Sequence, residues 1–124
     1  GYFKNESFAN QIEDLLVLAG DDKLKIYLSY INLGEIYYMI SKKINDNHAN
    51  KAWNAVLELP IILKELDLTL VRASAEIKSK YKLSYADSIA AALSIQLKSN
   101  LLTGDREFEN LSGLKDFKLE LLKY

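Results

Sequence analysis

Two neighbouring stretches decide the fold, Leu83–Ala92 (LSYADSIAAA) and Leu101–Phe108 (LLTGDREF). The first opens a run of apolar residues at helical spacing, which predicts a helix over Ser84–Ser99. The second starts with a short apolar run, which predicts a strand over Asn100–Thr103 that ends at a glycine. A short helix is expected to follow, over Asp105–Leu111. A helix that leads through a strand into another helix indicates an α/β arrangement.

The rest of the chain continues this alternation. Apolar residues at helical spacing predict four more helices, over Ser7–Ala19, Leu33–Lys43, Ala49–Leu59 and Leu68–Tyr81. Short apolar segments predict three more strands, over Lys25–Tyr30, Ile61–Leu66 and Lys118–Leu122. The alternation predicts an α/β fold with a largely parallel sheet, in one domain that spans residues 1–124. Ligands of such sheets bind at the carboxyl ends of the strands.

Composition narrows the class of protein. Hydrophobic residues make up 49% and charged residues 27% of the chain, a balance that argues against disorder. The absence of cysteine excludes disulfides and thiolate metal sites, and we expect a reducing, cytoplasmic setting. No apolar run is long enough to predict a membrane span. The net charge of −1 lacks the basic excess typical of nucleic-acid-binding proteins, although a carboxylate-rich active site also lowers the charge of a nuclease.

Three carboxylates lie just after predicted strands or near the start of predicted helices: Glu35, Asp87 and Asp105. Because the carboxyl ends of parallel strands meet at one edge of a sheet, we expect these side chains to converge. Mg²⁺ and Mn²⁺ prefer oxygen ligands of this kind. Two such ions roughly 3.5–4 Å apart can activate water for phosphodiester cleavage.

Each of these carboxylates also has a purely structural interpretation. Ser84 and Asp87 fit the S-x-x-D helix-capping pattern, and Asn32 and Glu35 offer a similar N-x-x-E cap. Asp105 would serve as a plain N-cap. The helix dipole stabilises an acidic residue in a first turn by about 0.3–1 kcal/mol. Spacing alone therefore favours caps and leaves an acidic metal site as the alternative.

Three segments, taken in order, resemble the motifs of the PIN-domain family. Ser29–Tyr38 (SYINLGEIYY) resembles the family's second motif, Leu83–Ala92 the third and Leu102–Phe108 (LTGDREF) the fourth. Their order and spacing agree with the family over nearly the whole chain. The resemblance implies a three-layer α/β/α PIN-like fold with a central, mainly parallel sheet.

The resemblance also implies a function. It implies that Glu35, Asp87 and Asp105 are catalytic ligands of Mg²⁺ or Mn²⁺, with the Thr103 hydroxyl in support. The implied activity is that of a VapC-like toxin, an endoribonuclease that hydrolyses RNA with metal-activated water. The implied partners are an RNA substrate, a cognate antitoxin protein and a second copy of the chain. The alternative is a catalytically impaired PIN-like module that acts through antitoxin or dimer contacts.

The chain departs from the family at its front. The family opens with a strand that ends in the first catalytic aspartate, whereas Gly1–Ser7 (GYFKNES) resembles the segment just after that strand. We expect this strand to come from outside the 124 residues, as part of a longer chain or from a partner. The chain without it is expected to be impaired as an enzyme. Tyr37, Tyr38 and Met39 are expected to line the antitoxin or dimer surface.

Overall fold

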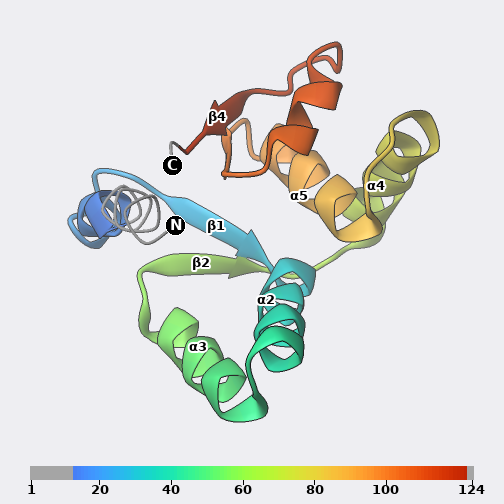
Figure 1. Cartoon of the computed structure of the whole chain (residues 1–124). Coiled ribbons are helices and arrows are strands. Elements are labelled where there is room, and N and C mark those ends of the chain that lie inside the picture. Colours follow the sequence, from blue (N-terminus) through green and yellow to red (C-terminus); the bar gives the residue numbers. More distant parts are fainter. Residues whose placement is uncertain (1–12, 123–124) are drawn as a thin grey trace.

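A computed structural model describes residues 13–122 (Figure 1). Residues 13–20 are helical. The elements that follow are β1 (Ile26–Ser29), α2 (Tyr30–Lys43), α3 (Asp46–Glu58), β2 (Ile61–Lys64), α4 (Leu68–Lys80), α5 (Tyr85–Gln96), β3 (Leu101–Thr103), the 3-10 helix η1 (Arg106–Leu111) and β4 (Leu119–Leu121). This order confirms the predicted alternation and the α/β class. The first part of the predicted Ser7–Ala19 helix lies outside the described residues.

The strands form two parallel pairs. In the first pair Ile26 of β1 lies opposite Ile61 of β2, and in the second Leu101 of β3 lies opposite Leu119 of β4. Parallel pairing is as predicted, but within residues 13–122 the two pairs are separate sheets and not one continuous sheet. A cavity of about 670 Å³ lies between them and is lined by β1, β3 and α5.

The passage from β1 into α2 has no loop. Ser29 is fully buried, and its hydroxyl accepts a hydrogen bond from the backbone N–H of Asn32 at 3.0 Å. This makes Ser29 the N-cap, so α2 begins at Tyr30 and not at Leu33 as predicted. The predicted cap formed by Asn32 and Glu35 is wrong for the same reason, because both residues lie inside the helix.

The main core forms where α4 packs against α5 and η1 closes over them. Its buried side chains are Leu70, Ile77, Leu83, Ile89, Ala91, Ala92, Leu93, Phe108 and Leu111. Small residues on α5 let α4 approach closely. The buried hydroxyls of Ser74 and Ser94 donate to the carbonyls of Leu70 and Ala91, each at 2.7 Å, so neither is left unsatisfied. α5 ends at Gln96, earlier than predicted, because Lys98 takes a left-handed backbone with φ of 54°.

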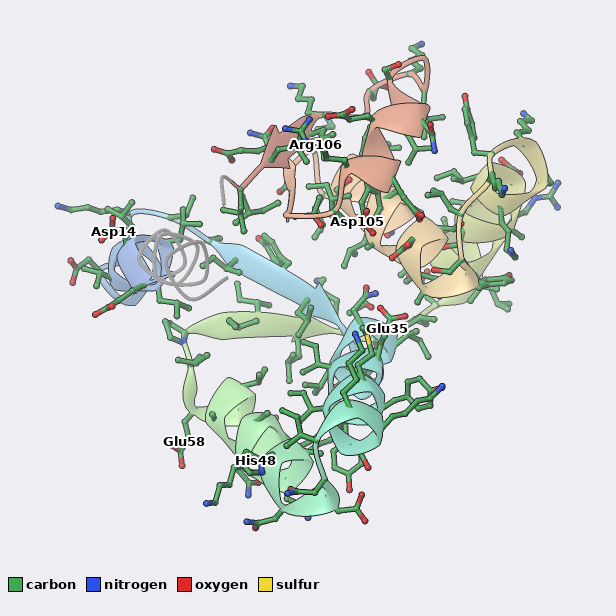
Figure 2. All side chains as sticks on the ribbon, in the orientation of Figure 1. Asp14, Glu35, His48, Glu58, Asp105 and Arg106 are labelled. Carbon is green, nitrogen blue, oxygen red and sulfur yellow. The ribbon has the colours of Figure 1, made fainter. Side chains whose placement is uncertain are left out.

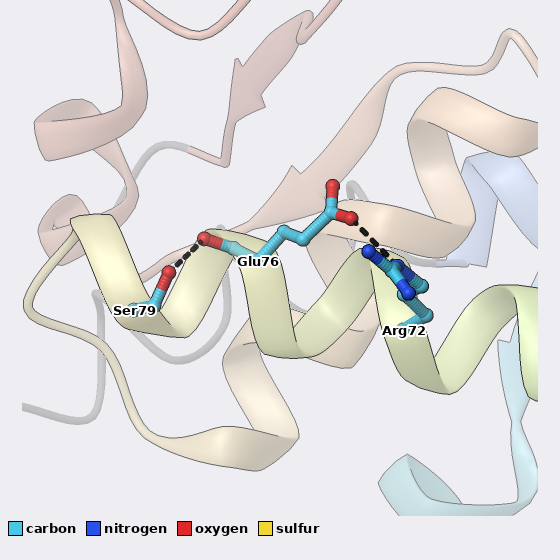
Figure 3. A network of polar contacts seen from close by, with 3 residues as sticks. All are labelled: Arg72, Glu76 and Ser79. Atoms are coloured by element: carbon cyan, nitrogen blue, oxygen red, sulfur yellow. Dashed lines mark hydrogen bonds and ion pairs between the residues drawn. The ribbon is translucent and has the colours of Figure 1, made fainter.

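The solvent face of α4 carries a small polar network (Figure 3). Arg72 Nε donates to Glu76 Oε1 at 3.1 Å, and Ser79 Oγ donates to the Glu76 carbonyl at 2.8 Å. Both charged side chains are mostly exposed, and exposed pairs of this spacing contribute about 0.3–0.5 kcal/mol. The buried face of α4, and not this network, therefore holds the helix in place.

A second helical layer consists of α2 and α3, which pack against each other on the other side of the β1–β2 pair (Figure 1). The ring of Tyr37 meets the ring of Trp53 edge-on, with centroids 6.1 Å apart. Ala49 of α3 is fully buried. None of the helices within residues 13–122 is long and apolar enough to cross a bilayer.

We predict that Leu111→Ala destabilises the fold by about 2–5 kcal/mol, because it removes a fully buried side chain and leaves a cavity. Urea unfolding followed by circular dichroism measures the loss. Leu68→Ala is the matched control, since Leu68 is 87% exposed and its truncation should change stability by less than about 0.5 kcal/mol. Equal losses in the two variants would contradict this assignment of the core.

Candidate metal centre

Three carboxylates meet at the end of β3 and the start of α5. Oxygens of Asp87, Asp105 and Glu107 all lie within 4.8 Å of one another. Asp87 stands in the first turn of α5, and Asp105 comes two residues after the end of β3. The expected convergence of Asp87 and Asp105 is therefore observed. Oxygen donors grouped in this way match the ligands that Mg²⁺ and Mn²⁺ prefer.

Glu35 approaches this group from α2. It is half-buried in the second turn of the helix. Burial raises the pKa of its carboxyl above the ordinary value, and repulsion from Asp87 raises the pKa further. Glu35 is thus close enough to Asp87 for their charges to interact, although it does not belong to the tighter group of three. Figure 2 shows Glu35 at the end of α2 that faces Asp105, whereas His48 and Glu58 lie far away on α3.

The pKa of the Asp87 carboxyl depends on several neighbouring groups. Burial raises its pKa, a hydrogen bond with the Ser84 side chain lowers it, and the nearby charges of Asp105 and Glu107 raise it again. The net pKa is raised. Without a cation, the surroundings of Asp87 therefore disfavour its ionised form. Protonation of Asp87 or binding of a cation compensates the unfavourable negative charge.

The capping interpretations of the segments around Asp87 and Asp105 also hold. The Ser84 hydroxyl caps α5 by accepting from the Asp87 N–H at 3.1 Å. Asp105 caps η1, since its Oδ1 accepts from the Glu107 N–H at 2.9 Å. The Thr103 hydroxyl accepts from the Asp105 N–H at 3.0 Å and so steadies the backbone at this point. The geometry thus combines capping with convergence of the same carboxylates.

Sequence reasoning missed Glu107. The predicted helix over Asp105–Leu111 gave Glu107 no role, and its exposed carboxylate has no obvious pattern of its own. The structure places it in the site because Asp105 caps a tight 3-10 turn, which brings the residue two positions later back beside it. The available signal was a pair of acidic residues separated by one position, Asp105 and Glu107, directly after a predicted strand and a glycine.

Asp87 connects the carboxylate group to the cavity between the strand pairs. Ser29, Asn32, Asp87 and Thr103 line that cavity, whose remaining lining is mostly apolar. Of the predicted site residues, the structure brings the carboxylates of Asp87 and Asp105 together. Glu35 lies near enough to Asp87 for their charges to interact, and the Thr103 hydroxyl binds the backbone N–H of Asp105. The Gly1–Ser7 segment, on which the expectation about a first aspartate rests, lies outside the described residues.

Known proteins resemble this chain in overall structure. By sequence, no curated protein matches the chain. Among solved structures, it is similar to VapBC2 from Rickettsia felis bound to a promoter DNA fragment, with a TM-score of 0.70, 19% identity, and coverage of 94% of this chain and 85% of that one. It is also similar to DNA-bound VapBC from Salmonella typhimurium, with a TM-score of 0.70, 14% identity, and coverage of 94% and 89%.

A third similar structure is VapC20 from Mycobacterium tuberculosis, described as a toxin that cleaves the sarcin-ricin loop, with a TM-score of 0.62, 13% identity, and coverage of 78% and 76%. At these identities the likeness shows the fold, an α/β fold like that of these VapC-type structures. The model of the PIN domain family matches residues 1–114, which is most of the sequence. The chain therefore belongs to the PIN domain family.

Proposed function

We propose that this chain is a VapC-like toxin nuclease that hydrolyses RNA phosphodiester bonds with the help of Mg²⁺ or Mn²⁺. The observation that carries the proposal is the group formed by Asp87, Asp105 and Glu107, whose oxygens lie within 4.8 Å of one another. Membership of a nuclease family gives this group a chemical purpose. RNA and the choice of metal are part of the proposal and rest on the family's activity.

The donor set fits a hard divalent cation. Glu35, Asp87 and Asp105 are the proposed ligands, and Glu107 joins them because of its position. All four offer carboxylate oxygens, and cysteine is absent from the chain. Mg²⁺ and Mn²⁺ favour such oxygen-only sites and complete their shells with water and substrate phosphate.

A divalent cation at such a site supplies Lewis-acid activation of water and neutralises charge on the phosphate. The residues of the chain hold the metal-binding carboxylates in position. Asp87 is fixed at the start of α5 by the Ser84 cap, and Asp105 is fixed through its own cap and the Thr103 hydroxyl. The N-terminus of α5 lies at the same point and offers partial positive charge to an anionic substrate.

The first test is Asp87→Asn in the complete protein. The substitution keeps the size of the side chain but removes a charged ligand, so we expect Mn²⁺-dependent RNA cleavage to fall by about 100-fold or more. Changes to mere partners of metal ligands already alter affinity or activity by about 10–100-fold. The assay follows cleavage of a labelled RNA with and without Mn²⁺.

Asp46→Asn serves as the matched control for that assay. Asp46 also stands in the first turn of a helix, but on α3 and exposed to solvent, so its variant should cleave like the parent. Undiminished cleavage by Asp87→Asn would refute the assignment of the site. Failure of the parent chain to bind Mn²⁺ by calorimetry would instead favour the non-catalytic interaction module.

The raised pKa values predict how stability depends on pH. A carboxyl whose pKa is higher in the folded than in the unfolded state favours folding while it is protonated, and this contribution is lost as pH rises through the folded pKa. Both Glu35 and Asp87 belong to this class. Ionisation of Asp87 therefore works against the fold when no cation is present.

We accordingly expect Asp87→Asn to become more stable relative to the parent chain as pH rises from about 3 to about 7. Urea unfolding in the presence of a chelator, repeated across this pH range, measures the difference. The stability difference between Asp46→Asn and the parent serves as the reference for an exposed aspartate. A stability difference that is independent of pH would contradict the shifted pKa of Asp87.

We also propose an antitoxin as partner, as in the VapBC complexes that share the fold. Apolar and aromatic side chains remain exposed along α2 and α3, among them Tyr38, Met39, Trp53 and Leu57. Of the residues expected at a partner surface, Tyr38 and Met39 are exposed, while Tyr37 is half-buried against Trp53. That the chain forms a homodimer and that it acts in the cytoplasm remain predictions.

Trp53 offers a direct probe of this surface, because it is the only tryptophan of the chain and is 37% exposed. Binding of the cognate antitoxin should shift its fluorescence to shorter wavelength. Leu57→Glu, one turn along the same face of α3, should weaken binding about tenfold or more. Leu68→Glu, at the exposed first residue of α4, is the control. Unchanged affinity in Leu57→Glu would place the antitoxin elsewhere.

A further inference from the structure

Asn32 links two helices that carry different parts of the candidate metal centre. Its side-chain Nδ2 donates to the carbonyl oxygen of Ala86 at 3.1 Å, across 54 positions of sequence. Its Oδ1 accepts from the hydroxyl of Ser29 at 2.6 Å. The same Ser29 hydroxyl accepts from the Asn32 backbone N–H at 3.0 Å. The Asn32 side chain is therefore held at both ends, by α2 and by α5.

Neither helix needs this link in order to form. Ser29 alone caps α2, and Ser84 caps α5. Within a helix the Ala86 carbonyl has its own partner four residues later, so the bond from Asn32 uses the second acceptor position of that oxygen. The bond thus adds nothing to either helix by itself. What it fixes is the position of the start of α2 relative to the start of α5.

The two ends of the link lie directly beside proposed ligands. Asn32 is three residues before Glu35, which is one turn of α2, and Ala86 immediately precedes Asp87. Because Ser29 is fully buried, the α2 end of the link is anchored in the protein interior. Asn32 and Asp87 both line the cavity between the strand pairs. A shift at this link would change the separation of Glu35 and Asp87.

We propose that Asn32 is a positioning residue, which fixes Glu35 of α2 relative to the carboxylates on α5 and η1. This inference rests on the proposed metal-dependent function. Asn32 contacts neither substrate nor metal in this role. It acts through the amide bond to Ala86, in the way that partners of metal ligands orient those ligands.

The test variant is Asn32→Ser in the full chain. A serine hydroxyl can still bond to Ser29 and suits the first turn of a helix, but its side chain is too short to reach Ala86. Calorimetric titration with MnCl₂ should show affinity weakened by about 10–100-fold, the usual effect of losing a partner of a ligand. Circular dichroism should show an unchanged fold.

Asn45→Ala is the matched control. Asn45 is the exposed N-cap of α3, and its side chain accepts a hydrogen bond from the His48 N–H at 2.8 Å. Its loss should lower stability by about 1 kcal/mol, as for other caps, and leave the affinity for Mn²⁺ as in the parent. A merely structural role for Asn32 would make the two variants behave alike in both measurements.

Cleavage at increasing Mn²⁺ gives a second readout. In Asn32→Ser the concentration of Mn²⁺ for half-maximal cleavage should rise by the same factor as the dissociation constant, while the rate at saturating Mn²⁺ approaches that of the parent. Parental Mn²⁺ affinity in Asn32→Ser would overturn this inference and leave the proposed function standing. Absence of Mn²⁺ binding by the parent chain would overturn both.

Discussion

Repulsion between like charges is the constraint on which the rest of this structure depends. Carboxylate oxygens of three residues lie within 4.8 Å of one another, and a fourth carboxylate, that of Glu35, interacts with Asp87. Partial burial, and after it the nearby negative charges, raises the pKa of Glu35 and of Asp87. Such an arrangement persists only where the backbone is held firmly by other contacts. The caps and core beneath the site provide those contacts.

The support comes from two separate parts of the fold. Asp87, Asp105 and Glu107 stand on α5 and η1, which share the core that contains Leu93 and Phe108. Glu35 stands on α2, which packs mainly against α3 and less extensively against α5 and β1. The first part is held by apolar packing. The second part meets α5 through helix packing and through the hydrogen bond from Asn32 to the Ala86 carbonyl, which is the contact proposed to position Glu35.

Much of this could be predicted from the sequence, because it depends on local patterns. Periodic apolar residues located most of the helices and strands described, and motif order brought Asp87 and Asp105 into one site. The start of α2 was missed because Ser29 could be read as strand as well as cap. Glu107 was missed because its position depends on the tight turn of η1. The separation of the two strand pairs is a tertiary property that no local pattern contains.

Asp67 shows why local spacing could not distinguish ligands from caps. It follows β2, and its side chain caps α4 by accepting from the Leu70 N–H at 2.8 Å. In these respects it matches Asp105, which follows β3 and caps η1. Yet Asp67 does not belong to the carboxylate group found within residues 13–122, whereas Asp105 does. A cap fixes a carboxylate in space, but a metal site also needs other carboxylates at the same place. The meeting of β3 with the start of α5 satisfies that second condition, and the end of β2 does not.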